Sequence, residues 1–463
     1  MSNATSSRVH YLLLYLHSSQ VESRANMEKQ DQEGICVAIR MRGLNERELK
    51  SGSAPVFKCL TNERVALINE KDGNPIERDT YQYDKVFDSK ANTVNIYDHV
   101  GRNLVEGVVT GINATIFAYG QTSSGKTYTM LGAQGSQGVL ELAATDLFRH
   151  IADTSNRDFI VRVSFVEIYN EVIRDLLSDA SDSTVNIRED PRKGVYCEAS
   201  EHAIQDFDSV MTVLKKGISR RAVESTAMND TSSRSHTIFK ITVESIESLQ
   251  EGVDRDMSVL VASLNLVDLA GSESVRHTGA TGQRAKEGGK INQSLLSLSR
   301  VIHALSQPGT HVSFRDSKLT RLLQPSLCGN AKMSIVCCVT PAEKYIEETR
   351  STLQFASRAK MVKTNATVNE ILDESEKIRR LTKELNALKE KQSEGGLSDG
   401  ERNMLQADKE HLQDRLESLQ NEKDQQRAQL QKLQELMFEN TLPSMDALEG
   451  KMKKKRKTKR DTW

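Results

Sequence analysis

The stretch Gly120-Gln121-Thr122-Ser123-Ser124-Gly125-Lys126-Thr127 follows the short apolar run 114–119. Its two glycines let the backbone wrap closely around an anion, so that successive N–H groups bind the α and β phosphates of a nucleotide. Lys126 then reaches the β and γ oxygens, and Thr127 offers its hydroxyl to Mg²⁺. We expect 114–119 to form a buried strand and the chain from Lys126 onward to form a helix whose N-terminus faces the phosphates. The stretch therefore predicts a P-loop.

Two later segments are placed to sense the nucleotide. Residues 229–236 read Asn-Asp-Thr-Ser-Ser-Arg-Ser-His. Residues 264–273 begin with a mostly apolar strand that ends at the carboxylate of Asp268, and Gly271 follows it. An Asp at the end of a buried strand is placed to hold a Mg²⁺-bound water, and Gly271 offers its N–H to the γ-phosphate. Taken alone, Asp268 also suits a cap of the next turn, and 229–236 also suits a solvated loop. Their order behind a P-loop favours nucleotide switches.

These three segments resemble the P-loop, switch I and switch II of the kinesin superfamily, and the resemblance covers residues 34–370, including 117–122, 166–171 and 314–323. It implies an α/β fold, namely a P-loop NTPase with a mixed central β-sheet flanked by helices. It also implies an ATP hydrolase that uses ATP and Mg²⁺ and binds microtubules through tubulin. Residues 120–130 and 323–325 look most like those of the centromere-associated mitotic kinesins.

The resemblance also implies roles for single residues. The catalytic set would be Ser232, Ser233, Arg234, Gly271 and Glu273, and Mg²⁺ would be held by Thr127, Ser233 and, through a water, Asp268. Ser232 would contact the attacking water. Arg234 and Glu273 would pair when the site closes, which would complete a water chain from the nucleophile to Glu273. A salt bridge that exists in only one state is a bistable element, as coupling requires.

The expected adenine site involves the first strand, at 35–42, where the family reads R-x-R-P and this chain has Gly43 in place of proline. The resemblance implies that Arg40 covers one face of the adenine and Tyr128 the other. Because a guanidinium and a phenol ring stack on any purine, we expect modest base selectivity. The full nucleotide-binding set would be Arg40, Gly120, Gln121, Thr122, Ser123, Ser124, Gly125, Lys126, Thr127 and Tyr128.

An amphipathic helix is expected at 291–302, directly after switch II, and in kinesins this relay helix lies on tubulin. Basic residues near it suit an acidic filament: Arg276, Arg284, Lys286, Arg315, Lys318 and Arg321. Scattered cations are often only a solvated surface, and it is the resemblance that favours tubulin.

Residues 361–370 resemble the neck linker of kinesins with an N-terminal motor. Val362 would fill a docking pocket and Asn369 would act as a latch, which implies movement toward the microtubule plus end. Two rival functions stay open. One is a non-motile, nucleotide-binding microtubule crosslinker, and the other is a nucleotide switch that ignores filaments.

Heptad patterns follow the linker. Ile371, Ile378 and Leu385 share one heptad position, which predicts a neck coiled coil at 371–394 and a homodimer. A Gly-rich break at 395–401 precedes a second coiled-coil segment at 402–440, whose seam is interrupted by polar residues. An isolated charged helix is the alternative for these segments.

Composition limits the remaining choices. The 463 residues suffice for a motor domain at 34–360 plus an appendage, and a net charge of −1 makes nucleic acid an unlikely partner of the whole chain. The six cysteines lack zinc spacing, which indicates reduced thiols in the cytoplasm. No run approaches the roughly 18 apolar residues of a membrane span, so we expect no membrane insertion and a location on microtubules or the spindle.

We expect the first and the last residues of the chain to lie outside the folded segments. We expect residues 1–33 to be a disordered N-terminal extension, and Met27 is an alternative start. The tail 441–463 contains a basic run at 451–460, with eight cations in ten residues, which predicts a disordered arm. Such a run suits a nuclear import signal, a nucleic-acid patch or a tether to acidic tubulin. The sequence does not indicate a cargo.

Overall fold

The computed structural model describes residues 33–372 except 70, 181–182, 191–193, 228–232, 248–257, 274–282 and 308, with a few isolated residues beyond 372. One compact unit comprises Met1–Leu249 with Val259–Glu370, and a second comprises Gln250–Ser258 with Ile371–Trp463. The expected extension before residue 33, both coiled-coil segments, the break between them and the basic tail lie outside the described residues, apart from the isolated positions.

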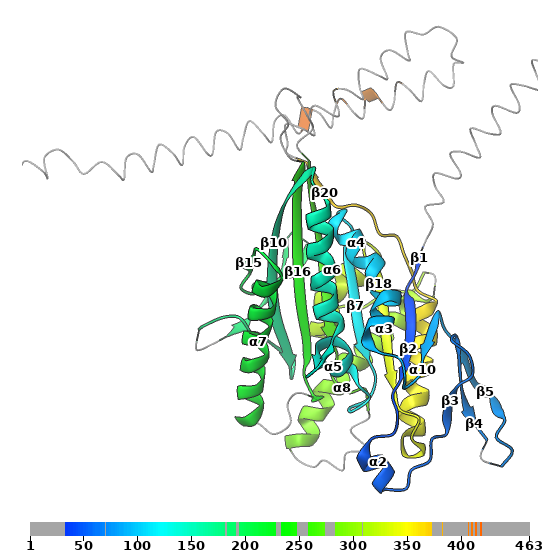
Figure 1. The fold of residues 1–463 in the computed structure, drawn as a ribbon. Helices are drawn as coiled ribbons and strands as arrows, with labels where there is room; N and C mark the ends of the chain where they lie inside the picture. The colour runs from blue at the N-terminus through cyan, green and yellow to red at the C-terminus, as the bar shows by residue number, and fades with distance from the viewer. Residues whose placement is uncertain are drawn as a thin grey trace, which may run out of the picture. The chain divides into compact units, whose positions relative to one another are not determined.

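A long mixed sheet forms the centre of the first unit, in the order β12-β11-β10-β16-β17-β7-β18-β2-β6. Figure 1 labels β10, β16, β7, β18 and β2 in this sheet. Strands β17, β7, β18, β2 and β6 run parallel to one another, whereas β10, β16 and β17 are antiparallel neighbours. The bounds are β2 (Cys36–Met41), β6 (Lys85–Phe87), β7 (Ala114–Tyr119), β10 (Arg157–Tyr169), β11 (Val172–Asp175), β12 (Thr184–Val185), β16 (His236–Glu247), β17 (Ser258–Asp268) and β18 (Lys332–Val339). The expected mixed central sheet is confirmed.

Register at the centre of the sheet positions the site. All of Ala114–Tyr119 is buried, as expected for a strand covered on both faces. Asp268, the last residue of β17, pairs with Ala118, so β17 ends beside the point where the P-loop leaves β7. Since ligands of open α/β sheets bind beyond the carboxyl ends of parallel strands, these two ends locate the site.

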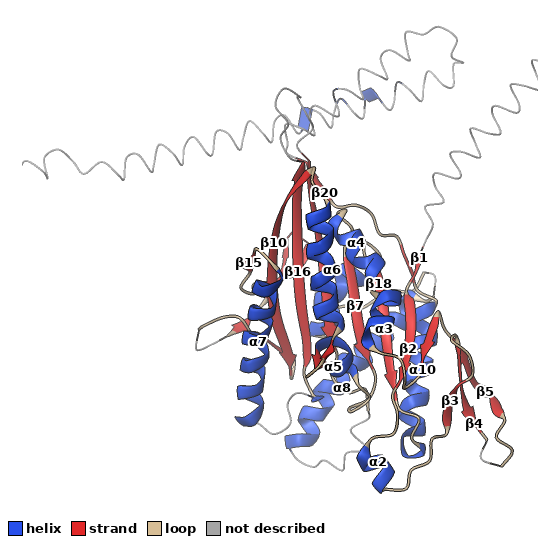
Figure 2. Cartoon of the chain, in the orientation of Figure 1, coloured by secondary structure: helices blue, strands red, loops and turns tan. Residues whose placement is uncertain are grey.

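Helices cover both faces of the sheet, and Figure 2 shows α4 and α6 across the face turned to the viewer. On that face the core contains residues of α3 (Thr93–Val100), α4 (Arg102–Val109), α6 (Val139–Asp153) and α7 (Phe207–Ala227). The opposite core contains residues of α8 (Gln283–Leu305), α9 (Lys318–Leu327) and α10 (Ile346–Lys360). Along β7, Ile116 belongs to the first core and Phe117 to the second, which is the alternation of a strand between two layers.

Smaller elements surround the sheet. They are β1 (Glu33–Gly34), α2 (Glu46–Lys50), β3 (Phe57–Cys59), β4 (Arg64–Ile68), β5 (Pro75–Gln82), α5 (Lys126–Leu131), β8 (Gly132–Ala133), β9 (Ser136–Gln137), β13 (Ile187–Asp190), β14 (Gly194–Cys197), β15 (His202–Ile204), the 3₁₀ turn η3 (Glu343–Tyr345), β19 (Lys363–Thr364) and β20 (Glu370–Leu372). Strands β1 and β19 pair antiparallel, which joins the start of the described chain to the linker after α10. Among the helices that the structure describes, none has the length and apolar character needed to cross a bilayer.

Candidate nucleotide-binding site

The P-loop is a strained turn between β7 and α5. Gly120 has φ 143°, and a Cβ on it would lie 2.1 Å from the carbonyl oxygen of Cys338 in β18, so no other residue fits there. Ser123 and Gly125 also have positive φ, at 62° and 104°. Helix α5 then begins at Lys126, as the sequence predicted.

Lys126 is buried inside this loop. Its ammonium group donates to the carbonyl oxygens of Gly120 and Gln121, both at 2.8 Å. Burial lowers the pKa of Lys126, although the nearby carboxylates of Asp268 and Glu273 act in the opposite direction. A bound phosphate would compete with these carbonyls for the N–H groups of Lys126. Its negative charge would compensate the ammonium charge more fully than the carbonyl oxygens do.

Asp268 lies where a cation would be held. The Thr127 hydroxyl donates to its Oδ2 at 2.7 Å, whereas its buried Oδ1 has no hydrogen-bond partner in the described structure. Burial raises the pKa of Asp268, and the Thr127 hydrogen bond and the Arg221 and Lys126 charges oppose that shift. Since a buried polar atom without a partner is costly, Oδ1 is suited to accept a hydrogen bond from a metal-bound water.

Arg221 and Glu167, which the sequence analysis did not select, complete a buried charge network. Arg221 on α7 lies 3.4 Å from Glu167 on β10 and 3.9 Å from Asp268, and it donates to the Ser235 hydroxyl at 3.2 Å. Their side chains are 8% or less exposed, so the Arg221 guanidinium helps to compensate the charge of both buried carboxylates. The only sequence signal was the position of Glu167 within the motif 166–171.

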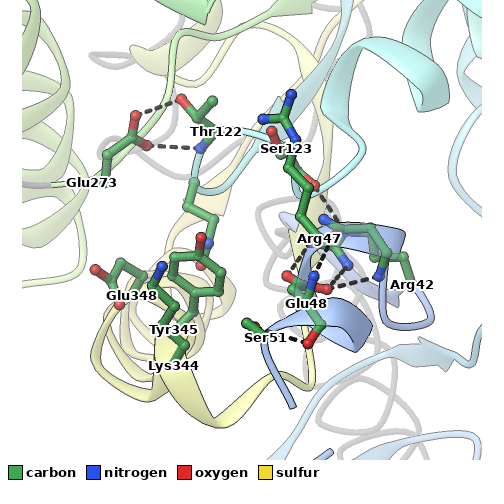
Figure 3. Close-up of a pocket in the computed structure, with 12 residues that line it drawn as sticks. Arg42, Arg47, Glu48, Ser51, Thr122, Ser123, Glu273, Lys344, Tyr345 and Glu348 are labelled. Carbon is green, nitrogen blue, oxygen red and sulfur yellow. Dashed lines mark hydrogen bonds and ion pairs between the residues drawn. The ribbon is translucent and has the colours of Figure 1, made fainter. Parts of the chain in front are cut away.

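The two switches touch each other and the P-loop. Gly271 donates its N–H to the Ser233 carbonyl at 2.9 Å, and Glu273 accepts the Thr122 N–H at 2.7 Å as well as the Thr122 hydroxyl (Figure 3). The N–H expected to bind the γ-phosphate is thus used between the switches in this structure. The pairing of Arg234 with Glu273 stays a prediction, and Ser232 lies outside the described residues.

The adenine side differs from the expected sandwich. The Arg40 guanidinium lies 4.9 Å from the centroid of the Tyr128 ring, a direct cation–π contact that leaves no room for a base between them. Hydrogen bonds from Arg40 to Thr129 at 2.8 Å and Thr93 at 3.3 Å hold the guanidinium inward, and Arg40 is buried. Tyr128 is 42% exposed and keeps a free surface on which a base can stack.

A cavity of about 420 Å³ opens beside the P-loop, between α2, residues 121–123 and residues 344–348 (Figure 3). Arg42 braces this wall, since it donates to the Ser123 carbonyl at 2.8 Å and to both carboxylate oxygens of Glu48 at 2.7 Å. Burial raises the pKa of Glu48, but the hydrogen bonds and charge of Arg42 outweigh it, so the net shift is downward. Sequence reasoning missed this brace.

The basic residues expected to contact tubulin differ in their exposure to solvent. Arg315 is exposed, whereas the side chain of Arg321 is only 15% exposed. Both pair with Glu189 on β13, and Arg321 also donates to Gln324. The contact of Arg321 with tubulin stays a prediction, and in this structure its guanidinium pairs with Glu189. The side chains of Arg276, Arg284 and Lys286 lie outside the described residues.

Two residues of the expected neck linker, Val362 and Asn369, contact other parts of the first unit. Val362 is 1% exposed, and its carbonyl accepts the N–H of Ile35 at 3.1 Å. Asn369 donates its backbone N–H and its Nδ2 to the Gly111 carbonyl at 2.8 and 3.1 Å, and its Oδ1 accepts from Asn330 at 2.8 Å. Both residues occupy positions that suit a pocket and a latch.

Known proteins are similar to this chain in sequence. Residues 40–362 match the family model of the kinesin motor domain. The chain is 43% identical to Kinesin-related protein 4 of Dictyostelium discoideum, over 76% of this chain and 18% of that protein. It is 42% identical to Kinesin-like protein KIN-7L of Oryza sativa subsp. japonica, over 78% of this chain and 57% of that protein. The chain thus spans less than two thirds of these curated relatives.

Two solved structures are similar to this chain in fold and in sequence. A fast kinesin, described with its ATPase mechanism and its interactions with microtubules, has a TM-score of 0.66 and 37% identity, over 73% of this chain and 95% of that chain. A KIF14 dimer in a two-heads-bound state, with AMP-PNP and in complex with a microtubule, has a TM-score of 0.69 and 34% identity, over 76% of this chain and 100% of that chain.

Proposed function

The chain belongs to the kinesin motor-domain family, whose members are ATPases, and from that premise we propose that it is a microtubule motor that hydrolyses ATP to move. One observation carries the proposal. The P-loop, the end of switch I and the start of switch II meet beyond the adjacent ends of β7 and β17, where Asp268 accepts a hydrogen bond from Thr127. A phosphate-binding loop beside two switch segments is the arrangement that a nucleotide-driven motor requires, which supports the proposal.

ATP would be bound mainly through its phosphates. Lys126 would exchange its two carbonyl acceptors for β and γ oxygens, which are stronger acceptors because they are charged. The base would stack on the exposed surface of Tyr128, with Arg40 supporting that ring from within.

Mg²⁺ fits the residues present. Thr127, Ser233 and the partnerless Oδ1 of Asp268 supply hydroxyl and carboxylate oxygens, the ligands and water acceptors that Mg²⁺ prefers. No cluster of three or more His, Cys, Asp or Glu occurs in the part of the chain that the structure describes, which agrees with a metal completed by waters and phosphates. When bound, Mg²⁺ neutralises charge on the β and γ oxygens.

Hydrolysis would depend on closure of the switches. Ser232 would orient the attacking water, and Glu273 would leave Thr122 to pair with Arg234. In this arrangement Gly271 would exchange the Ser233 carbonyl for a γ-phosphate oxygen. Because phosphoryl transfer requires positioning and electrostatic stabilisation more than covalent chemistry, these small movements would suffice to switch activity on.

Motion would follow from linker docking. Val362 would enter its pocket and Asn369 would close the latch on Gly111, with β1 adding a second strand to the linker. A linker that docks along an N-terminal motor domain directs the stroke to the microtubule plus end. Support for this direction comes from the resemblance of residues 361–370 and from the contacts that Val362 and Asn369 make.

The filament would be bound near α8 and α9. Arg284 and Lys286 on α8 and Arg315 and Lys318 near the start of α9 would face acidic tubulin, whereas Arg321 would act indirectly by holding Glu189 of β13. Complementary charge raises association rates more than affinity, so salt should weaken this contact.

Finer assignments are also proposals. The match of residues 120–130 favours the centromere-associated branch, and the heptads at 371–394 favour a homodimer on microtubules or the spindle. A tagged protein that gathers at centromeres in dividing cells would support the branch, and a tag confined to interphase microtubules would contradict it. Sedimentation of the whole chain would decide between dimer and monomer.

A gliding assay on polarity-marked microtubules tests the main proposal. A surface coated with the whole chain should drive microtubules with their minus ends leading when Mg-ATP is added, which a plus-end-directed motor produces. Microtubules that bind but stay still, without stimulated phosphate release, would indicate the crosslinker. ATP turnover that microtubules do not change would indicate the filament-independent switch.

A further inference from the structure

A buried imidazole connects three elements next to the nucleotide site. His236 is the last residue of switch I and the first residue of β16, and it is 2% exposed. Its Nδ1 lies 3.0 Å from the backbone nitrogen of Ala270 in switch II, and its Nε2 lies 2.7 Å from the hydroxyl oxygen of Ser294 on α8. The ring therefore bridges switch II and α8.

The tautomer of His236 follows from its partners. Because Ala270 donates its N–H to Nδ1, that nitrogen carries no proton, and Nε2 must donate to the Ser294 hydroxyl. Burial lowers the pKa of His236 to about 3, and the charges of Lys126 and Arg221 act in the same direction. The imidazole thus stays neutral at physiological pH, with a fixed direction of hydrogen bonding from switch II to α8.

The contact lies beside the bond between the two switches. Gly271, the next residue after Ala270, donates its N–H to Ser233 at 2.9 Å. A movement of switch II that changes the Gly271 bond also moves the Ala270 N–H. Since a buried N–H must keep a partner, the imidazole has to follow or the bond has to break.

Helix α8 is placed to receive that movement. Ser294 is 2% exposed and is followed by the buried residues Leu295 and Leu298, so this part of the helix is packed into the core. Packed elements respond to displacement by changing between discrete arrangements, not by deforming gradually. A pull or release at Ser294 would therefore shift the helix as a whole.

We propose that His236 is a positioning residue that couples switch II to α8 through Ser294. The inference rests on the proposed microtubule-stimulated ATPase, in which α8 lies on the filament. Filament binding would act on α8, and the chain Ser294–His236–Ala270 would pass that change to the switches. His236 contacts neither substrate nor metal in this assignment.

Ser294→Ala in the whole chain tests the coupling, with Ser297→Ala as control, because Ser297 is equally buried on the same helix. Ser294→Ala should keep basal ATPase within about twofold but lower the turnover at saturating microtubules about tenfold, the effect of one lost buried hydrogen bond. The microtubule concentration for half-maximal activation should stay unchanged, since no filament-facing residue is altered. Ser297→Ala should be activated normally.

His236→Asn completes the test, since an Asn amide can replace Nδ1 but does not reach Ser294. The double variant with Ser294→Ala should lose no more microtubule activation than either single variant, because both changes break the same hydrogen bond. If His236→Asn does not fold, Ser294→Ala alone decides. Full activation of folded Ser294→Ala, or an equal loss in Ser297→Ala, overturns the inference. A wild-type chain without microtubule activation refutes the proposed function instead.

Discussion

Asn369→Ala should weaken docking of the linker while leaving the nucleotide site intact. The side chain of Asn369 makes two hydrogen bonds, from Nδ2 to the Gly111 carbonyl at 3.1 Å and from Asn330 to Oδ1 at 2.8 Å. Its backbone bonds to Gly111 and Val261, at 2.8 and 2.9 Å, do not depend on the side chain. The substitution therefore removes the side-chain part of this contact and leaves the backbone part in place.

The magnitude follows from these contacts. Each neutral hydrogen bond contributes about 0.5–1.5 kcal/mol net, so two contribute about 1–3 kcal/mol. Asn330 is exposed, and water can replace Asn369 as its acceptor, which favours the lower half of that range. We expect a loss of about 1–2 kcal/mol, which shifts the docked-to-undocked ratio roughly fivefold to thirtyfold.

Docking should be measured by energy transfer between a dye on the linker and a dye on the motor core, together with gliding velocity and ATPase rate. Velocity should fall while the ATPase rate stays within about twofold, because the phosphate site is untouched. Asn62→Ala, an exposed asparagine in the β3–β4 turn, is the matched control. Normal docking and velocity in Asn369→Ala would refute the latch.

Three further predictions concern the charges. Glu273→Ala should bind ATP normally but fail to hydrolyse it, so that the motor domain stays bound to microtubules. Assays of nucleotide binding and of phosphate release measure these two effects. Arg221→Met should lower the free energy of unfolding by about 3–5 kcal/mol, because it removes the guanidinium beside the buried carboxylate of Glu167 and one of the two cations near Asp268, and thermal unfolding checks this. Deletion of 451–463 should weaken microtubule binding mainly at low ionic strength, if the basic run is a tether, and cosedimentation across a salt series measures it.

Each of these has a control. Glu348→Ala, which alters a neighbouring carboxylate of the same cavity, should hydrolyse ATP, and normal turnover in Glu273→Ala would contradict its assignment. Arg78→Met, at an 83% exposed side chain, should be neutral, and an equal effect at both arginines would remove the argument from buried charge. Equal binding of truncated and whole chains at low salt would favour the import signal.

Local pattern predicted the elements that position the phosphate site. The apolar run 114–119, the helix start at Lys126 and the end of the strand at Asp268 all lie where the sequence placed them. These features are determined by neighbours in the chain, namely by an apolar run, a glycine and a polar residue at a strand end. A P-loop is such a local feature, which is why it could be found without knowledge of the rest of the fold.

Contacts between distant segments could not be predicted in the same way. Arg40 was expected to lie against the base, but Thr93 and Thr129, which are 53 and 89 residues away, hold it against Tyr128. The pairing of Arg321 with Glu189 could not be predicted either, because the two residues are 132 residues apart in the sequence. Whether a charged side chain lies in solvent or in a buried ion pair depends on its partner, and the topology of the fold determines which partner it meets. The same reasoning explains why Arg221 was missed: the guanidinium that compensates Asp268 comes from α7, and only the packing of α7 against β10 brings it there.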